Sequence, residues 1–133
     1  MLSPGAAAGD ARGMTYECNK SIGDYGERVA ADHLRSLGMV ILATQWTCKF
    51  GEIDIVARDG STLVICEVKT RTSHRYGGPF EAVTGQKAAR LRRLATHWLE
   101  VNDVDPPSVR IDVVSVLLPP AGAPVVDRIA GVA

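Results

Sequence analysis

The sequence predicts an α/β fold, in which helices cover one mixed sheet within a single domain. Two segments have the periodicity of amphipathic helices, and five have the apolar and β-branched content of strands. Their order along the chain is α, β, β, β, α, β, β, which is typical of a mixed sheet with helices packed on it. The chain has 133 residues, of which 46% are apolar, and this suits one compact core.

The first helix is expected over residues 21–37, where apolar side chains recur at helical spacing. Ser21 and Asp24 resemble a capping box at its start, and Gly38 follows as a stop signal. The segment before it is rich in small residues, so residues 1–18 are expected to form a flexible tail and residues 19–133 the folded domain. Residues 39–46 have the composition of the first strand.

The next two strands, residues 50–58 and 61–70, are predicted to form a hairpin through Asp59-Gly60, a dipeptide typical of a type I′ turn. Counting outward from that turn places Glu52 opposite Glu67, with Asp54 diagonally near. Side chains alternate along a strand, so two groups are predicted. One face carries Glu52, Asp54, Glu67 and Lys69, and the other carries Ile53, Ile55, Val64, Cys66 and Val68.

Residues 71–83 are polar and contain glycine, which indicates a mobile loop. The second helix is expected over residues 84–101, with Trp98 on its apolar stripe as a core residue. Strands at residues 109–118 and 125–129, separated by PPAGAP, complete the chain.

Charge is unevenly distributed, although 15 basic and 15 acidic residues give a net charge of zero. From Lys69 to Arg93 there are seven basic residues and one acidic residue, Glu81. This segment is a candidate anion-binding surface, so the zero net charge does not exclude nucleic acid. The other interpretation is a solvated helix face.

The acids of the hairpin need an explanation, because like charges opposed across two strands destabilise them. A divalent cation offsets that repulsion, and carboxylate oxygens suit Mg²⁺ or Mn²⁺. Lys69 beside such a site would orient or deprotonate a water, as in phosphodiester hydrolysis. On spacing alone, a solvent-facing hairpin in which lysine neutralises the acids is an equally good interpretation. Glu27, an acid at the edge of the first helix's apolar stripe, does not decide between them.

The three cysteines, Cys18, Cys48 and Cys66, have no CxxC spacing, which favours the reducing cytoplasm over a disulfide framework. Cys66 lies in an apolar run and is expected to be a core residue. The longest apolar runs are far shorter than the roughly 20 residues of a membrane-spanning helix, so no membrane is expected as a partner. The first residues lack the pattern of a secretory signal.

Five motifs occur in order over about residues 20–117: GERVAADHLRSLG, GEIDIVARDG, EVKTR, EAV with QKAARLRRLA, and RIDVVSV. Together they resemble the YraN family of bacterial proteins, which looks like a member of the PD-(D/E)XK nuclease superfamily. The resemblance implies a restriction-endonuclease-like core, in α-β-β-β-α-β order. It matches Asp54 to a metal-binding aspartate, Glu67 and Lys69 to the ExK pair, and Glu27 to the acid of the first helix.

We therefore expect a metal-dependent nuclease-like protein that hydrolyses DNA on branched or structured substrates. The alternatives are a noncatalytic nucleic-acid-binding module on the same scaffold and, with less support, a protein interaction partner. The expected catalytic residues are Glu27, Asp54, Glu67 and Lys69. The expected ligands of Mg²⁺ or Mn²⁺ are Asp54, Glu67 and Glu52. The expected nucleic-acid contacts are Arg71, Arg75, Gln86, Lys87, Arg90 and Arg93. A homodimer is also open, because dimeric nucleases cut two strands.

Overall fold

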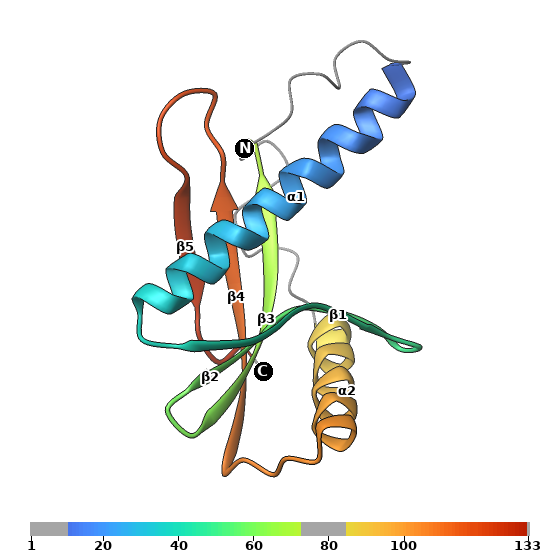
Figure 1. Cartoon of the computed structure of the whole chain (residues 1–133), viewed down its shortest axis with the longest axis vertical. Coiled ribbons are helices and arrows are strands. Elements are labelled where there is room, and N and C mark those ends of the chain that lie inside the picture. Colours follow the sequence, from blue (N-terminus) through green and yellow to red (C-terminus); the bar gives the residue numbers. More distant parts are fainter. Residues whose placement is uncertain (1–10, 73–84, 133) are drawn as a thin grey trace.

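The computed structural model describes residues 11–72 and 85–132. Its elements follow the predicted order (Figure 1). They are α1 (Ala11–Ser36), β1 (Val40–Cys48), β2 (Gly51–Asp59), β3 (Thr62–Arg71), α2 (Gly85–Asn102), β4 (Ser108–Leu117) and β5 (Val125–Ile129). The predicted α/β class is thereby confirmed. Within the described ranges, no helix is both long and apolar enough to cross a membrane.

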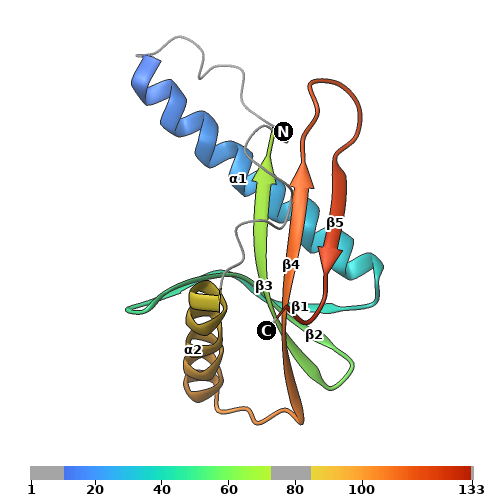
Figure 2. The ribbon, with the colours of Figure 1, turned by 180° about the vertical axis from the view of Figure 1, so that it is seen from behind.

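The strands form one mixed sheet in the order β1-β2-β3-β4-β5. Neighbouring strands are antiparallel except β3 and β4, which run parallel and are joined through α2. Parallel neighbours require such a crossover connection. Helix α1 crosses in front of β3 and β4 in Figure 1 and behind them in Figure 2, so it lies against one face of the sheet.

Each helix packs on its own apolar layer, because successive residues of β3 alternate between the two faces of the sheet. Val64 and Cys66 pack with Leu34 of α1, whereas Leu63 and Ile65 pack in the layer beneath α2. Cys66 is fully buried, and burial raises the pKa of its thiol. Trp98 is also buried, in the α2 layer. The predictions that Cys66 and Trp98 are core residues are confirmed.

Helix α1 begins ten residues earlier than the sequence pattern suggested, at Ala11 rather than Ser21. Residues 11–20 contain several good helix formers and no proline, so a helix can extend through them. Residues 11–18, expected in the tail, therefore belong to α1. The capping-box prediction is wrong, since Asp24 lies inside the helix and pairs with Lys20 at 3.2 Å.

The hairpin of β2 and β3 turns one residue later than predicted. Asp59 pairs with Thr62, so the two turn residues are Gly60 and Ser61. Gly60 has a positive φ of 62° whereas Asp59 does not, which fits a type II′ turn with glycine first. The register consequently shifts by two residues, and the predicted pairing of Glu52 with Glu67 is wrong.

The regular pairing of β2 with β3 ends just before the acids of the hairpin. Its last pair is Ile55 with Cys66, so Asp54 and Glu67 are the next residues on the two strands. On its other side, β2 pairs with β1, where Glu52 is opposite Thr47. Within the paired residues 55–59 and 62–66, a shift by an even number changes the partners but keeps each side chain on its predicted face.

Strand β1 is irregular at two places: its register against β2 shifts between Ile41 and Ala43, and Gln45 has a φ of 51°. The alternation of side chains is also interrupted within β2. Ile53 packs in the α2 layer and Ile55 in the α1 layer, although only one residue separates them. The prediction that both isoleucines share a face is wrong: the alternation in β2 is broken between them, where its regular pairing with β3 ends.

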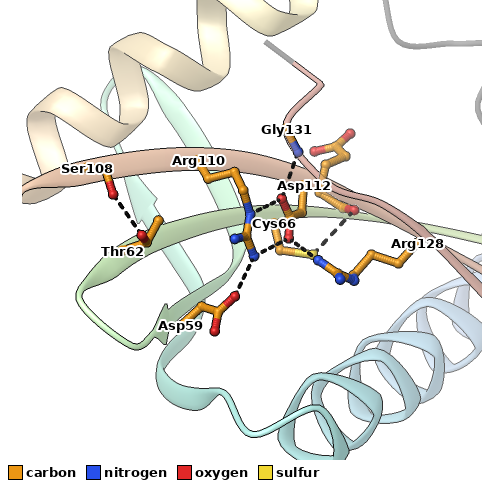
Figure 3. A network of polar contacts seen from close by, with 9 residues as sticks. Asp59, Thr62, Cys66, Ser108, Arg110, Asp112, Arg128 and Gly131 are labelled. Carbon is orange, nitrogen blue, oxygen red and sulfur yellow. Dashed lines mark hydrogen bonds and ion pairs between the residues drawn. The ribbon is translucent and has the colours of Figure 1, made fainter.

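A buried ion network joins β4 to the end of the hairpin, to β5 and to the residues after β5 (Figure 3). Its centre is Asp112, whose side chain is fully buried. The guanidinium of Arg110 donates to both Asp112 oxygens, at 2.8 and 3.0 Å, and also reaches Asp59 at 3.1 Å. Arg128 donates at 2.8 Å and the backbone N–H of Gly131 at 3.1 Å. The buried carboxylate is thus well satisfied by hydrogen bonds.

Candidate active site

Helix α1 lies very close to β3 at Gly26, which is buried. A Cβ added there would overlap the side chain of Thr70 on β3, including its Oγ1 atom. Only glycine permits so close a contact between helix and strand. The next residue on the helix, Glu27, is therefore held beside the sheet.

Glu27 meets two acids of β2 at this crossing. Glu27, Glu52 and Asp54 each offer a carboxylate oxygen, and the three oxygens lie within 4.8 Å of one another. Asp54 is further fixed by the backbone N–H of Val68, which donates to its Oδ2 at 2.8 Å. Hereafter these three residues are called the acid cluster.

Burial and mutual repulsion disfavour the charged forms of two members of the acid cluster. Burial, followed by the charges of Asp54 and Glu52, raises the pKa of Glu27 from 4.5 to about 7. Burial, with the charges of Glu67 and Glu52, raises the pKa of Asp54 from 3.8 to about 6, although the Val68 N–H acts in the opposite direction. The acid cluster is thus a place where added positive charge would be stabilising.

A divalent cation fits this arrangement. Glu27 Oε1 is buried and has no hydrogen-bond partner within the described part of the chain. A buried oxygen without a partner is costly, and so is a group of crowded carboxylates. Hard divalent cations such as Mg²⁺ and Mn²⁺ are bound by oxygen ligands of this kind. The residues present are consistent with such a site.

Glu67 forms a second charged group, on the β3 side of the site. Its Oε2 atom lies 2.7 Å from Nζ of Lys87 on α2 and 3.3 Å from Nζ of Lys69. Burial and the nearby side chain of Lys87 lower the pKa of Lys69, although Glu67 acts in the opposite direction. A lysine of lowered pKa more readily exchanges a proton.

The acid cluster and the Glu67 group are neighbours where the regular pairing of β2 and β3 ends. The charge of Glu67 contributes to the raised pKa of Asp54, which places the two carboxylates within electrostatic reach. The structure therefore brings the predicted residues Glu27, Glu52 and Asp54 together. It sets Glu67 and Lys69 beside them, with Glu67 outside the group of three.

The predicted nucleic-acid contacts lie mainly on α2. Gln86, Lys87, Arg90 and Arg93 line one groove together with Ala89, and Arg90 and Arg93 are exposed. This surface is hereafter called the α2 groove. Arg71 lies at the end of β3 and is only partly exposed. Arg75 and all but the first two residues of the loop predicted at residues 71–83 lie outside the described residues.

Two residues of the site were not predicted from the sequence. Gln45 donates to Asp24 Oδ1 at 2.9 Å, and its contact with Glu27 partly offsets the rise in the pKa of that acid. Nothing in the strand pattern distinguishes Gln45, whose φ of 51° is unusual for a residue within a strand. Gly26 carried a weak signal, since a glycine inside a helix often marks close packing.

Comparisons with known proteins identify close relatives. A family model described as uncharacterised protein family UPF0102 matches residues 26–116, a range that includes the acid cluster, Glu67, Lys69 and the α2 groove. A UPF0102 protein of Nocardioides sp. is 52% identical over 113 residues, which cover 85% of this chain and 91% of that protein. One from Streptomyces coelicolor is 51% identical over 123 residues, which cover 91% and 95%. One from Kineococcus radiotolerans is 54% identical over 113 residues, which cover 84% and 93%.

Proposed function

The chain belongs to the uncharacterised protein family UPF0102, and we propose that it is a metal-dependent nuclease-like protein that hydrolyses phosphodiester bonds of nucleic acid. UPF0102 is the YraN family, so this membership confirms the resemblance to YraN proteins that the motifs indicated. The name of the family assigns no activity, so the proposal depends on the candidate active site. The observation that carries it is the acid cluster, with its unpartnered Glu27 oxygen, next to a lysine of lowered pKa.

In this proposal the acid cluster holds Mg²⁺ or Mn²⁺, and Glu67, which lies beside the cluster and pairs with Lys87, is a further ligand. When bound, such a cation supplies positive charge that polarises a phosphoryl oxygen and stabilises charge developing on it. The hydrogen bond from Val68 N–H keeps Asp54 in a fixed position, so less ordering is needed when the site is filled. Raised carboxyl pKa values also mean that the site is loaded more readily as pH increases.

Lys69 is the residue proposed to act on the attacking water. Its pKa is lowered, so its ammonium can lose a proton at a smaller cost than an exposed lysine. Glu67 Oε2 lies 3.3 Å from Lys69 Nζ and restrains its position. Deprotonated, Lys69 would accept the proton of a water attacking phosphorus. Protonated, it would donate a hydrogen bond to the phosphoryl oxygen.

The α2 groove is proposed to bind the phosphate backbone. Arg90 and Arg93 are exposed, and arginine pairs with phosphate through two parallel hydrogen bonds. Such contacts position a nucleic acid without reading its sequence. DNA is the proposed substrate, in branched or structured form.

A noncatalytic nucleic-acid-binding module is the second candidate. The observation in its favour is the 2.7 Å pair between Glu67 and Lys87, which neutralises this carboxylate without a metal. Such a protein would keep the α2 groove and the scaffold. The crowding of Glu27, Glu52 and Asp54 argues against it, because acids repel the phosphates that the module would bind.

A cleavage assay decides between these candidates. Branched, single-stranded and duplex DNA, with RNA for comparison, would be incubated with Mg²⁺ or Mn²⁺ and with wild-type protein, Lys69→Ala or Lys20→Ala. Lys20 is an exposed lysine of α1 and serves as the matched control. Cleavage by wild type and Lys20→Ala that disappears in Lys69→Ala supports the nuclease. Binding without any Lys69-dependent cleavage would favour the noncatalytic module instead.

A further inference from the structure

Aromatic side chains gather at the turn between β1 and β2. The rings of Phe50 and His97 meet edge to face at 5.1 Å, and those of Trp46 and His97 lie 5.9 Å apart. The ammonium of Lys49 lies 5.1 Å from the centre of the Phe50 ring. Trp46, Lys49, Phe50 and His97 are hereafter called the aromatic turn. It joins ring faces and positive charge in one small surface.

Phe50 is accessible from solvent. It is 41% exposed, while the other large exposed apolar side chains of the described residues are aliphatic. The turn that carries it projects past α2 at the side of the molecule (Figure 1). An exposed aromatic ring next to a positive charge is the kind of surface on which an unpaired base can stack.

The aromatic turn continues the α2 groove. Gln86, Arg90, Arg93 and His97 are spaced four, three and four residues apart, and therefore follow one stripe of the helix. At 1.5 Å per residue, this stripe is about 16 Å long. Lys87, near the start of the stripe, contacts Glu67, and Phe50 is two residues from Glu52. A strand lying in the groove would thus pass from the candidate active site to the aromatic turn.

We propose that the aromatic turn stacks on an unpaired nucleobase of a strand whose phosphates lie in the α2 groove. The inference rests on the proposed function in taking nucleic acid as the ligand of that groove, and it narrows the substrate class to strands with unpaired nucleotides. Every base has a π face, so stacking on Phe50 or His97 tolerates any sequence. The bases of an intact duplex are stacked on one another, which leaves the aromatic turn without a partner there.

Binding measured in EDTA tests this inference without cleavage. Fluorescently labelled single strands of deoxythymidine and of uridine, and a DNA duplex, would be titrated with wild type, Phe50→Leu and Phe50→Trp. Leucine keeps an apolar side chain but has no ring, whereas tryptophan keeps an aromatic ring. We expect Phe50→Leu to weaken single-strand binding by about tenfold, while Phe50→Trp restores it. Duplex affinity should remain within about twofold, because it depends on phosphate contacts.

Three controls make the outcome specific. Leu37→Ala removes an exposed apolar side chain at the end of α1 and should change nothing. Arg90→Ala should weaken single strand and duplex alike, because it removes a phosphate contact. Thermal unfolding of each variant checks that the fold is intact. The two single strands show whether the sugar matters, and binding of either in a Phe50-dependent way supports the inference.

The inference is overturned if Phe50→Leu leaves single-strand affinity unchanged, if it weakens duplex binding equally, or if wild type binds neither single strand. These outcomes are separate from failure of the proposed nuclease. Phe50-dependent binding without metal-dependent cleavage would leave the stacking site standing and remove only the enzyme. Lys69-dependent cleavage together with binding that does not depend on Phe50 would support the nuclease and remove only the stacking site.

Discussion

Nζ of Lys87 on α2 lies 2.7 Å from Oε2 of Glu67 on β3, and Nζ of Lys69 lies 3.3 Å from the same oxygen. One buried carboxylate thus connects the helix of the α2 groove to the strand that carries Lys69. The side chain of Lys87 is 19% exposed and that of Glu67 is 11% exposed, so solvent screens the pair only weakly. The position of the groove relative to the candidate active site depends on this contact.

Lys87→Met should therefore destabilise the fold as well as weaken the site. The variant leaves Glu67 buried with one cation fewer, and we expect a loss of about 1–3 kcal/mol in the free energy of unfolding. Urea denaturation measures it. Arg90→Met, on the exposed face of the same helix, is the control and should change stability by less than about 0.5 kcal/mol. Equal effects of the two substitutions would contradict this assignment.

Isothermal calorimetry with Mn²⁺ tests the acid cluster. Asp54→Asn preserves the shape of the side chain and an oxygen that can accept from Val68 N–H, but removes the negative charge. We expect its Mn²⁺ affinity to fall by at least about tenfold. Asp32→Asn, which alters an exposed aspartate of α1 paired with Arg35, should bind like wild type. If Asp54→Asn and wild type bind Mn²⁺ equally, Asp54 is not a ligand.

The pH dependence of stability should report Glu27. Its pKa rises from 4.5 to about 7 on folding, so the folded state disfavours the charged form. The stability that the protonated Glu27 carboxyl contributes to the fold is fully present below pH 4.5 and is lost as pH rises through about 7. In metal-free protein, Glu27→Gln should therefore gain stability relative to wild type between about pH 5 and pH 8. Urea denaturation of both proteins at these two pH values checks this. If the difference in free energy of unfolding between Glu27→Gln and wild type is the same at both, the prediction is contradicted.

Gly26→Ala should destabilise the contact between α1 and β3. The added methyl group would overlap Thr70, and we expect a loss of about 1–3 kcal/mol, with partial recovery in combination with Thr70→Ala. Gly23→Ala is a matched control in the same helix, because among the described residues no side chain other than those of its chain neighbours lies within 4 Å of the added methyl group. Since alanine favours helix more than glycine does, Gly23→Ala should stabilise by about 0.5–1 kcal/mol. Thermal and urea unfolding would show whether the two changes have opposite signs.

Asp112→Asn should be the most destabilising of these substitutions. It removes the charge that pairs with Arg110 and Arg128 in a fully buried position, so we expect a loss of about 3–5 kcal/mol in the free energy of unfolding. Asp127→Asn, on the exposed side of β5, should have little effect. A small effect of Asp112→Asn on urea denaturation would show that the network contributes little to the fold.

Much of the fold followed from local patterns. Both helices and all five strands occur where periodicity and composition indicated, with ends that differ by about two residues except at the start of α1. That start was missed because the residues before Ser21 favour helix by propensity, while the apolar stripe used to locate the helix lies further along. The turn was displaced by one residue, since Asp59-Gly60 and Gly60-Ser61 both satisfy the general preference for glycine in hairpins.

Local patterns in the sequence were enough to predict the order of the elements, the two-sided apolar pattern of β3 and the acids and lysines that interrupt it. These are local properties, set by propensity and by the alternation of side chains. Which of these side chains meet depends on how the elements pack in three dimensions. The close crossing at Gly26 brings Glu27 to Glu52 and Asp54, and the packing of α2 brings Lys87 to Glu67. Such contacts depend on the twist of the sheet and on the distance between helix and strand, which no single segment encodes.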